Sequence, residues 1–169
     1  MPLVAFDTNI CIWCIKQTCT SGQEPEMKKA IELANTLSRA NFEILITLPV
    51  VTELLSNIPD QNARIKLYKD IQARFHLGMF DEKAALILSD ILNFHFLQSN
   101  REYQNLGITK THLKYDSLLI AIAKSSGAEA LYSHDGNCKN TAAHFFDVLN
   151  LDERPKSISQ NVGLFQTEN

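Results

Sequence analysis

The chain has 169 residues, 45% of them hydrophobic, and its formal net charge is −3. This length suits a single domain with a substantial buried core. The charge excludes a globally basic nucleic-acid-binding protein and is too small for an acidic disordered protein, although it leaves room for a local basic face.

The N-terminal residues point to a protein of the cytoplasm. Asp7 ends the first apolar run, and no basic segment precedes that run, so we expect no signal peptide. No apolar run approaches the roughly 18 residues that span a bilayer, so we expect no membrane contact. The chain has four cysteines, Cys11, Cys14, Cys19 and Cys138. This number and spacing do not form the dense framework of a secreted disulfide scaffold.

The first half of the chain alternates short apolar runs with stripes of helical periodicity. Residues 3–6 predict a buried strand that ends at Asp7, and residues 42–47 predict a second strand. Two of the helical stripes begin at prolines, Pro25 and Pro49, which suit a first turn. In full, helices are expected over residues 10–16, 25–39, 49–56 and 61–74.

The second half continues this alternation. Helices are predicted over residues 81–97 and 116–126, and strands over residues 130–132 and 145–149. Residues 98–114 are polar and mixed and receive no assignment. The order of elements predicts an α/β fold with a mostly parallel central sheet. We expect one domain over residues 1–150 and a polar tail over residues 151–169.

Four carboxylates accompany the predicted strands and helices. Asp7 directly follows the first strand, and Asp135 follows the strand at Tyr132. Glu53 lies in the helix after the second strand, and Asp116 opens a strongly apolar helix. Ligands bind beyond the carboxyl ends of parallel strands, where converging carboxylates need a cation to offset their repulsion. Oxygen ligands suit Mg²⁺ or Mn²⁺, and a bound pair of such ions implies phosphoryl chemistry.

Each carboxylate also has an ordinary structural explanation. Asp116 can be an N-terminal helix residue that the helix dipole favours. Asp135 precedes a glycine and can be a turn residue, and Glu53 can lie on a solvated face. For each carboxylate taken singly, a structural role is more common than a catalytic one. Taken together, their placement at the expected ends of α/β elements favours a functional site.

The carboxylates lie within four short motifs. These are Phe6-Asp7-Thr8-Asn9, Val51-Thr52-Glu53-Leu54-Leu55, Asp116-Ser117-Leu118-Leu119-Ile120-Ala121 and Ser133-His134-Asp135. In order, spacing and context, the motifs resemble those of PIN-domain nucleases, the family that includes the VapC-type toxins. The resemblance covers about residues 3–150. Residues 75–111 and the tail after Leu151 are longer than in the compact toxin-type members.

The resemblance implies a three-layer α/β/α PIN-like fold and metal-dependent RNA cleavage. It assigns catalysis and the binding of Mg²⁺ or Mn²⁺ to Asp7, Glu53, Asp116 and Asp135, with Asn9 and Ser133 as supports that orient the carboxylates. A toxin of this type implies an antitoxin partner, which would place an Arg or Lys in the acidic pocket and cover a groove between the helices over 25–39 and 49–56. A two-fold homodimer is a further expectation, as the commonest assembly.

Basic and aromatic residues supply candidate contacts to RNA. The candidates for phosphate contacts are Lys114, Lys110, Arg101 and Lys139. Two tyrosines, Tyr103 and Tyr115, can stack on unpaired bases. For any one of these residues, a solvated surface role is the more common outcome.

Three alternatives stay open. The chain can be a PIN-fold nuclease of RNA maturation or of structured DNA, or a non-catalytic binding scaffold. The presence of all four acids argues against the scaffold.

The pair Cys11 and Cys14 has the C-x-x-C spacing of a redox or zinc motif, but the chain has no second such pair, so we expect both cysteines to pack a helix.

Overall fold

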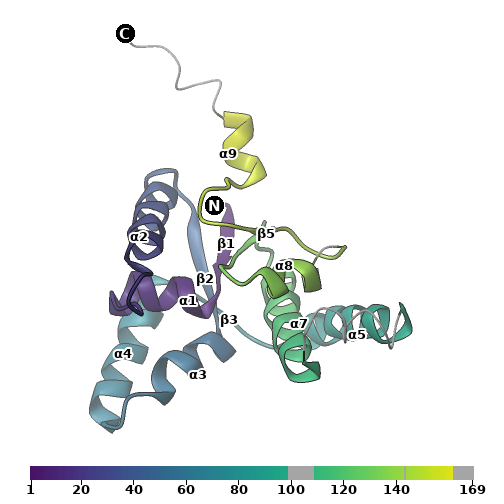
Figure 1. The fold of residues 1–169 in the computed structure, drawn as a ribbon, viewed down its shortest axis with the longest axis horizontal. Helices are drawn as coiled ribbons and strands as arrows, with labels where there is room; N and C mark the ends of the chain where they lie inside the picture. Colours follow the sequence, from purple (N-terminus) through teal and green to yellow (C-terminus); the bar gives the residue numbers. More distant parts are fainter. Residues whose placement is uncertain (99–108, 143, 162–169) are drawn as a thin grey trace.

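The computed structural model describes residues 1–98, 109–142 and 144–161 (Figure 1). Within these residues, five strands form one sheet in the order β3-β2-β1-β4-β5. The strands are β1 (Leu3–Phe6), β2 (Glu43–Thr47), β3 (His76–Gly78), β4 (Leu131–Tyr132) and β5 (Val148–Leu149). All four strand pairings are parallel, so the predicted α/β fold with a central, mostly parallel sheet is confirmed.

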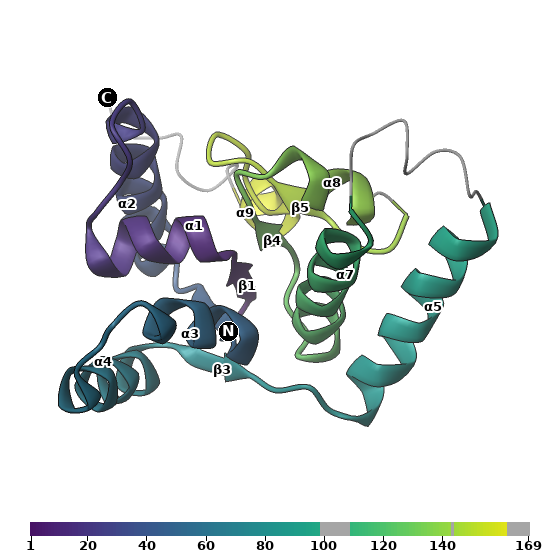
Figure 2. The same cartoon turned by 60° about the horizontal axis from the view of Figure 1, so that its bottom comes forward.

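Helices cover both faces of the sheet. On one side lie α1 (Thr8–Cys11), α2 (Glu24–Arg39) and α4 (Gln61–Arg74), and on the other lie α5 (Glu82–Gln98) and α7 (Lys110–Ser125) (Figures 1 and 2). The remaining helical segments are the π-helical turn η1 (Ile12–Lys16), α3 (Leu48–Ser56), α8 (Gly136–Ala142) and α9 (Lys156–Asn161). None of the helices in the described ranges is long and apolar enough to cross a bilayer.

The strand order reverses next to β1. The chain builds β1, β2 and β3 toward one edge and then returns to place β4 and β5 on the other side of β1. Phe6 pairs with Ile46 on one side and with Tyr132 on the other, so the carboxyl ends of β1, β2 and β4 lie at one level. Such a reversal is where open α/β sheets bind ligands.

The core follows from burial of the strands on both faces. Val4, Ala5 and Phe6 of β1 are at most 2% exposed. On α7, the run Leu119–Ala123 is buried all round, as expected for a helix packed between the sheet and α5. Burying the larger of these side chains, such as Val4, Phe6 and Leu119, contributes about 1.5–3 kcal/mol each relative to leaving them exposed.

Gly78 ends β3 at a point of close approach to α7. A Cβ atom at this position would lie 2.8 Å from Cγ2 of Ile122, closer than carbon atoms pack. The absence of a side chain at Gly78 therefore lets α7 lie directly against the sheet.

The structure corrects one expectation and extends others. Thr109 caps α7, and the helix begins at Lys110, so Asp116 lies in the middle of this helix and does not open it. The strand expected over 145–149 is limited to β5, and the sequence analysis did not predict β3. Leu151, which lies after the domain boundary expected at residue 150, is buried against the core. Arg101 and Tyr103 lie outside the described residues.

Candidate functional site

Asp7 occupies the reversal point of the sheet. It directly follows β1, is only 9% exposed, and caps α1 with its Oδ1 atom, which accepts a hydrogen bond from the Thr8 amide at 2.6 Å. Its second oxygen, Oδ2, accepts a hydrogen bond from the Ser133 hydroxyl at 2.7 Å. Both carboxylate oxygens are thus held, which fixes the direction in which the side chain points.

Ser133 joins the two central loops. It follows β4, as Asp7 follows β1, and its Oγ atom accepts a hydrogen bond from the Asp135 amide at 3.0 Å while donating to Asp7. The exposed Asp135 accepts a hydrogen bond at Oδ1 from the Asn137 amide at 2.8 Å, at the start of α8. One hydroxyl therefore ties the backbone that carries Asp135 to the carboxylate of Asp7.

Glu53 reaches the same region from α3. Pro49 stands in the first turn of this helix, which begins as β2 ends, so α3 starts at the carboxyl edge of the sheet. One carboxylate oxygen of Glu53, Oε2, accepts a hydrogen bond from the Thr8 hydroxyl. The residue after Asp7 thereby connects α1 to α3.

Asp116 comes from α7 and is also buried, at 9% exposure. Its Oδ2 atom has no hydrogen-bond partner among the residues that the structure describes. Leaving a buried carboxylate oxygen without a partner is costly, so the arrangement favours a proton or a cation at this position.

The electrostatics show that the four acids act on one another. Burial is the largest cause of the raised pKa of Asp7; the charges of Glu53 and Asp135 also raise it, whereas the hydrogen bonds from Ser133 and Thr8 lower it. Burial likewise raises the pKa of Asp116 to about 7, and the charges of Asp135 and Asp7 contribute. We call Asp7, Glu53, Asp116 and Asp135 the acid cluster.

The chemistry of the acid cluster fits a hard divalent cation. In the described ranges, no three His, Cys, Asp or Glu side chains are arranged so that they could hold a metal ion together. The donors are nevertheless all carboxylates, which Mg²⁺ and Mn²⁺ prefer, and one buried oxygen of Asp116 awaits a partner. A cation would relieve the mutual repulsion that raises the pKa of two of these groups.

Other predicted site residues lie farther out or are engaged elsewhere. Asn9 is exposed on α1, and within the described ranges no hydrogen bond connects it to the acid cluster. Lys110 and Lys114 are exposed on the first turns of α7. Lys139 contacts both carboxylate oxygens of Glu153 at 3.2 Å.

Sequence reasoning missed the roles of three neighbours of the acids. Thr8 follows Asp7 in the chain and holds Glu53, and Tyr115 precedes Asp116 and has a buried hydroxyl beside Glu53 and Thr8. Cys138 is fully buried, and the pKa of its thiol is raised by burial and by the nearby charges of Asp7 and Asp116. Adjacency to an acid was the signal available for Thr8 and Tyr115.

The cysteines of the C-x-x-C motif pack in the core. Cys11 is fully buried, and Cys14 donates a weak hydrogen bond from its thiol to the Ala30 carbonyl at 3.4 Å. Burial raises the pKa of Cys14 to about 12. The burial of Cys11 and the contact of Cys14 with Ala30 support the expected packing role of both cysteines.

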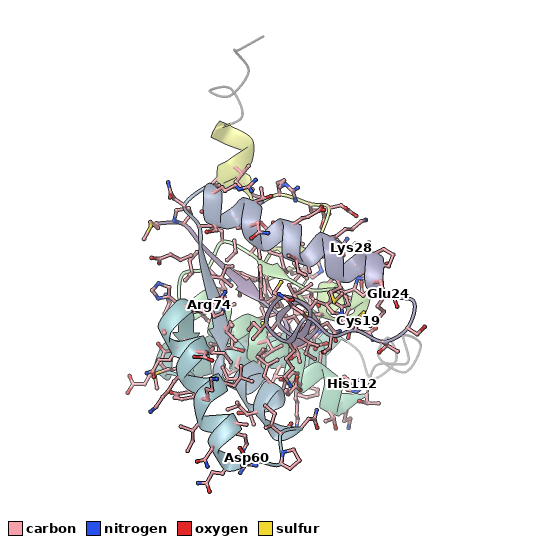
Figure 3. The ribbon with its side chains drawn as sticks, turned by 90° about the vertical axis from the view of Figure 1, so that its left-hand side faces the viewer. Cys19, Glu24, Lys28, Asp60, Arg74 and His112 are labelled. Carbon is pink, nitrogen blue, oxygen red and sulfur yellow. The ribbon has the colours of Figure 1, made fainter. Side chains whose placement is uncertain are left out.

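A second feature lies on the side of the sheet that α2 and α4 cover. A hollow of about 910 Å³ opens between α2 and the end of α4, above β2 and β3, and we call it the α2–α4 hollow. Figure 3 views this side, with Arg74 at the end of α4 nearest α2. Its lining is mixed: Ile15, Ile31 and Ile44 are apolar, and Asn35 and Gln72 are polar. Polar groups of Glu43 and His76, which also line it, lie 2.7 Å from each other.

Comparisons with known proteins yield matches in structure but not in sequence. No protein-family model matches the chain, and no curated protein matches it. The structure of VapBC2 from Rickettsia felis, bound to a DNA fragment from the promoter, matches 88% of this chain and 98% of the other, with a TM-score of 0.59 and 16% identity.

Two further VapBC structures give the same result. VapBC-1 from nontypeable Haemophilus influenzae matches with a TM-score of 0.61 and 15% identity, over 89% of this chain and 99% of the other. DNA-bound VapBC from Salmonella typhimurium matches with a TM-score of 0.55 and 17% identity, over the same shares. The chain therefore has the PIN-like α/β fold of the VapC toxins in VapBC structures.

Proposed function

We propose that the chain is a Mg²⁺- or Mn²⁺-dependent endoribonuclease and the toxin of a toxin–antitoxin pair. The observation that carries this proposal is the acid cluster at the reversal point of the sheet. Four carboxylates from β1, α3, α7 and the β4–α8 turn come together there, and one of them has a pKa of about 7. A purely structural role gives no reason to bury mutually repelling charges.

In this proposal the four carboxylates hold the divalent ions. Bound ions of this kind activate water and stabilise the leaving oxygen of a phosphodiester. Asp116 has to lose its proton before it can serve as a ligand. Ser133 holds the Asp7 carboxylate and the backbone of Asp135 in fixed positions relative to each other. Hydrolysis would leave a 5′ phosphate and a 3′ hydroxyl.

Basic residues around the cluster would bind the RNA backbone. Lys114 and Lys110 are the best placed, because they are exposed on α7 close to Asp116. Lys139 contributes less, because its ammonium group already contacts Glu153. Arg101 is retained as a candidate on sequence grounds. Phosphate contacts of this kind set affinity without selecting a sequence.

The antitoxin partner is supported by the fold relatives and by the α2–α4 hollow. The relatives are VapBC complexes, and one similar structure, from Klebsiella pneumoniae, is a toxin–antitoxin complex. An amphipathic helix from a partner would fill the hollow, with a basic side chain reaching the acid cluster. The hollow is lined by α2 and α4 and not by α3, so this surface differs from the groove that the sequence suggested. A homodimer is also retained in the proposal.

Cleavage of RNA with and without Mn²⁺ tests the proposed activity. We expect the wild type to cleave only with the ion, and Asp7→Asn to lose at least roughly 10²–10³-fold in rate, the range for removing one preorganised electrostatic group. Asp70→Asn, an exposed acid on α4, is the matched control. Equal activity of Asp7→Asn and wild type would reject the proposal. Co-purification from the native host would identify an antitoxin.

A further inference from the structure

Glu53 has the longest side chain in the acid cluster. It sits on α3, it has three rotatable side-chain bonds, and the hydrogen bond from Thr8 holds only its Oε2 atom. A flexible carboxylate binds a cation well only if its rotamers are restricted beforehand. A second group that restrains Glu53 would therefore matter for metal binding.

Tyr115 offers that second group. Its hydroxyl oxygen is buried beside Glu53 and Thr8, and it makes no hydrogen bond of good geometry to any residue described by the structure. A phenol, whose ordinary pKa is about 10, keeps its proton near neutral pH. A protonated phenol beside a carboxylate can act only as its donor.

The position of Tyr115 links three helices. It stands directly before Asp116 on α7, whereas Thr8 stands directly after Asp7 on α1, and both approach Glu53 on α3. Figure 2 shows α1, α3 and α7 around the end of β1. The Thr8 hydroxyl thus belongs to the residue after Asp7, and the Tyr115 hydroxyl belongs to the residue before Asp116.

We propose that Tyr115 is a positioning residue whose hydroxyl, together with that of Thr8, orients the Glu53 carboxylate within the acid cluster for a divalent cation. This inference rests on the proposed metal-dependent function. It assigns Tyr115 a role that depends on its hydroxyl group, whereas stacking on an RNA base would depend on its ring.

Removal of single hydroxyls tests this role in the full chain. Tyr115→Phe keeps the ring, and Tyr132→Phe is the matched control, because the Tyr132 hydroxyl donates to the Glu153 carbonyl at 3.1 Å, away from the cluster. Calorimetric titration with Mn²⁺ should show roughly tenfold weaker binding for Tyr115→Phe, as for loss of a group that orients a metal ligand. Tyr132→Phe should bind Mn²⁺ as the wild type does.

A second pair of variants tests whether the effect passes through Glu53. Thr8→Val should also weaken Mn²⁺ binding, and it carries the test if Tyr115→Phe does not fold. In the Glu53→Gln background, Tyr115→Phe should add no further loss. The inference is overturned if Tyr115→Phe binds Mn²⁺ like the wild type, or if its loss persists in that background. A wild type that binds no Mn²⁺ would instead overturn the proposed function.

Discussion

The acid cluster and the α2–α4 hollow both adjoin β1, yet they differ in what a ligand could satisfy: repelling charges in the cluster and open surface in the hollow. Asp7 belongs to the cluster, whereas the preceding Phe6 lines the hollow. In the cluster, charges repel, and a buried oxygen of Asp116 lacks a partner among the residues that the structure describes. In the hollow, the polar groups of Glu43 and His76 contact each other, and the open surface is partly apolar and partly polar.

Because of this difference, the two regions can accept different ligands. A cation relieves electrostatic repulsion but gains nothing from apolar surface, whereas a partner helix gains from apolar surface. The two regions should therefore respond to different substitutions, and each can be tested without disturbing the other.

The largest expected effect comes from removing a charge at the cluster. Asp116→Asn should abolish measurable RNA cleavage while raising the midpoint of thermal unfolding by about 2–4 °C in metal-free buffer, because it removes a buried, repelling carboxylate. Calorimetry and a cleavage assay on the same preparation check both halves. A fall in the unfolding midpoint with activity retained would mean that Asp116 stabilises α7 instead.

A substitution in the hollow should separate partner binding from cleavage. Ala34 lines the hollow on α2, so Ala34→Glu would bury a charge against an apolar partner and weaken its binding about tenfold or more. Thr36→Glu, on an exposed position of the same helix, is the control. Pull-down of the co-expressed partner measures the effect. Loss of RNA cleavage in Ala34→Glu would contradict the separation of the two regions.

The cluster should also make stability depend on pH. Because the pKa of folded Asp116 is about 7, above the ordinary value of 3.8, the folded state binds more protons than the unfolded state between these values. Stability contributed by the protonated form is therefore present below about pH 4 and is lost as pH rises toward 7. Unfolding midpoints at pH 5.5 and 7.5 should differ less in Asp116→Asn. An equal difference in both proteins would assign the pH dependence to other groups.

The smallest effect is expected at the RNA-binding surface. Lys114→Ala should weaken RNA binding a few-fold for all sequences and reduce the slope of log affinity against log salt by about 1. Lys139→Ala should have less effect, because Lys139 contacts Glu153. Binding measured at two salt concentrations tests both. If the two variants lose affinity equally, the contact with Glu153 does not withhold Lys139 from RNA.

The fold was predictable where burial imposes a pattern. The apolar run of β1 and the helical stripe of α2 were predicted because these elements bury one or both faces. The strand β3 was missed, since it has three residues, pairs only with β2 and begins with the exposed His76. The first turns of α7 expose lysines and a histidine, so no apolar stripe marked the start of this helix.

The candidate site was predictable in part for a related reason. Parallel strands bring their carboxyl ends together, so a residue such as Asp7 could be placed at the reversal point from its position after a strand. The hydrogen bond from Ser133 to Asp7 spans 126 positions and depends on the pairing of β1 with β4, which no local pattern encodes. The buried hydroxyl of Tyr115 depends likewise on how α7 packs against α3.

The missing side chain at Gly78 has a consequence for the distances within the cluster. Asp7 is fixed by β1, whereas Asp116 is fixed by α7, whose depth against the sheet depends on the contact of Ile122 with Gly78. Ile122 lies about 9 Å along the helix axis from Asp116, at roughly 1.5 Å per residue. The hydrogen atom that Gly78 carries in place of a side chain therefore helps to set the distance between Asp116 and Asp7, and we expect a methyl group there to change that distance without altering any charge.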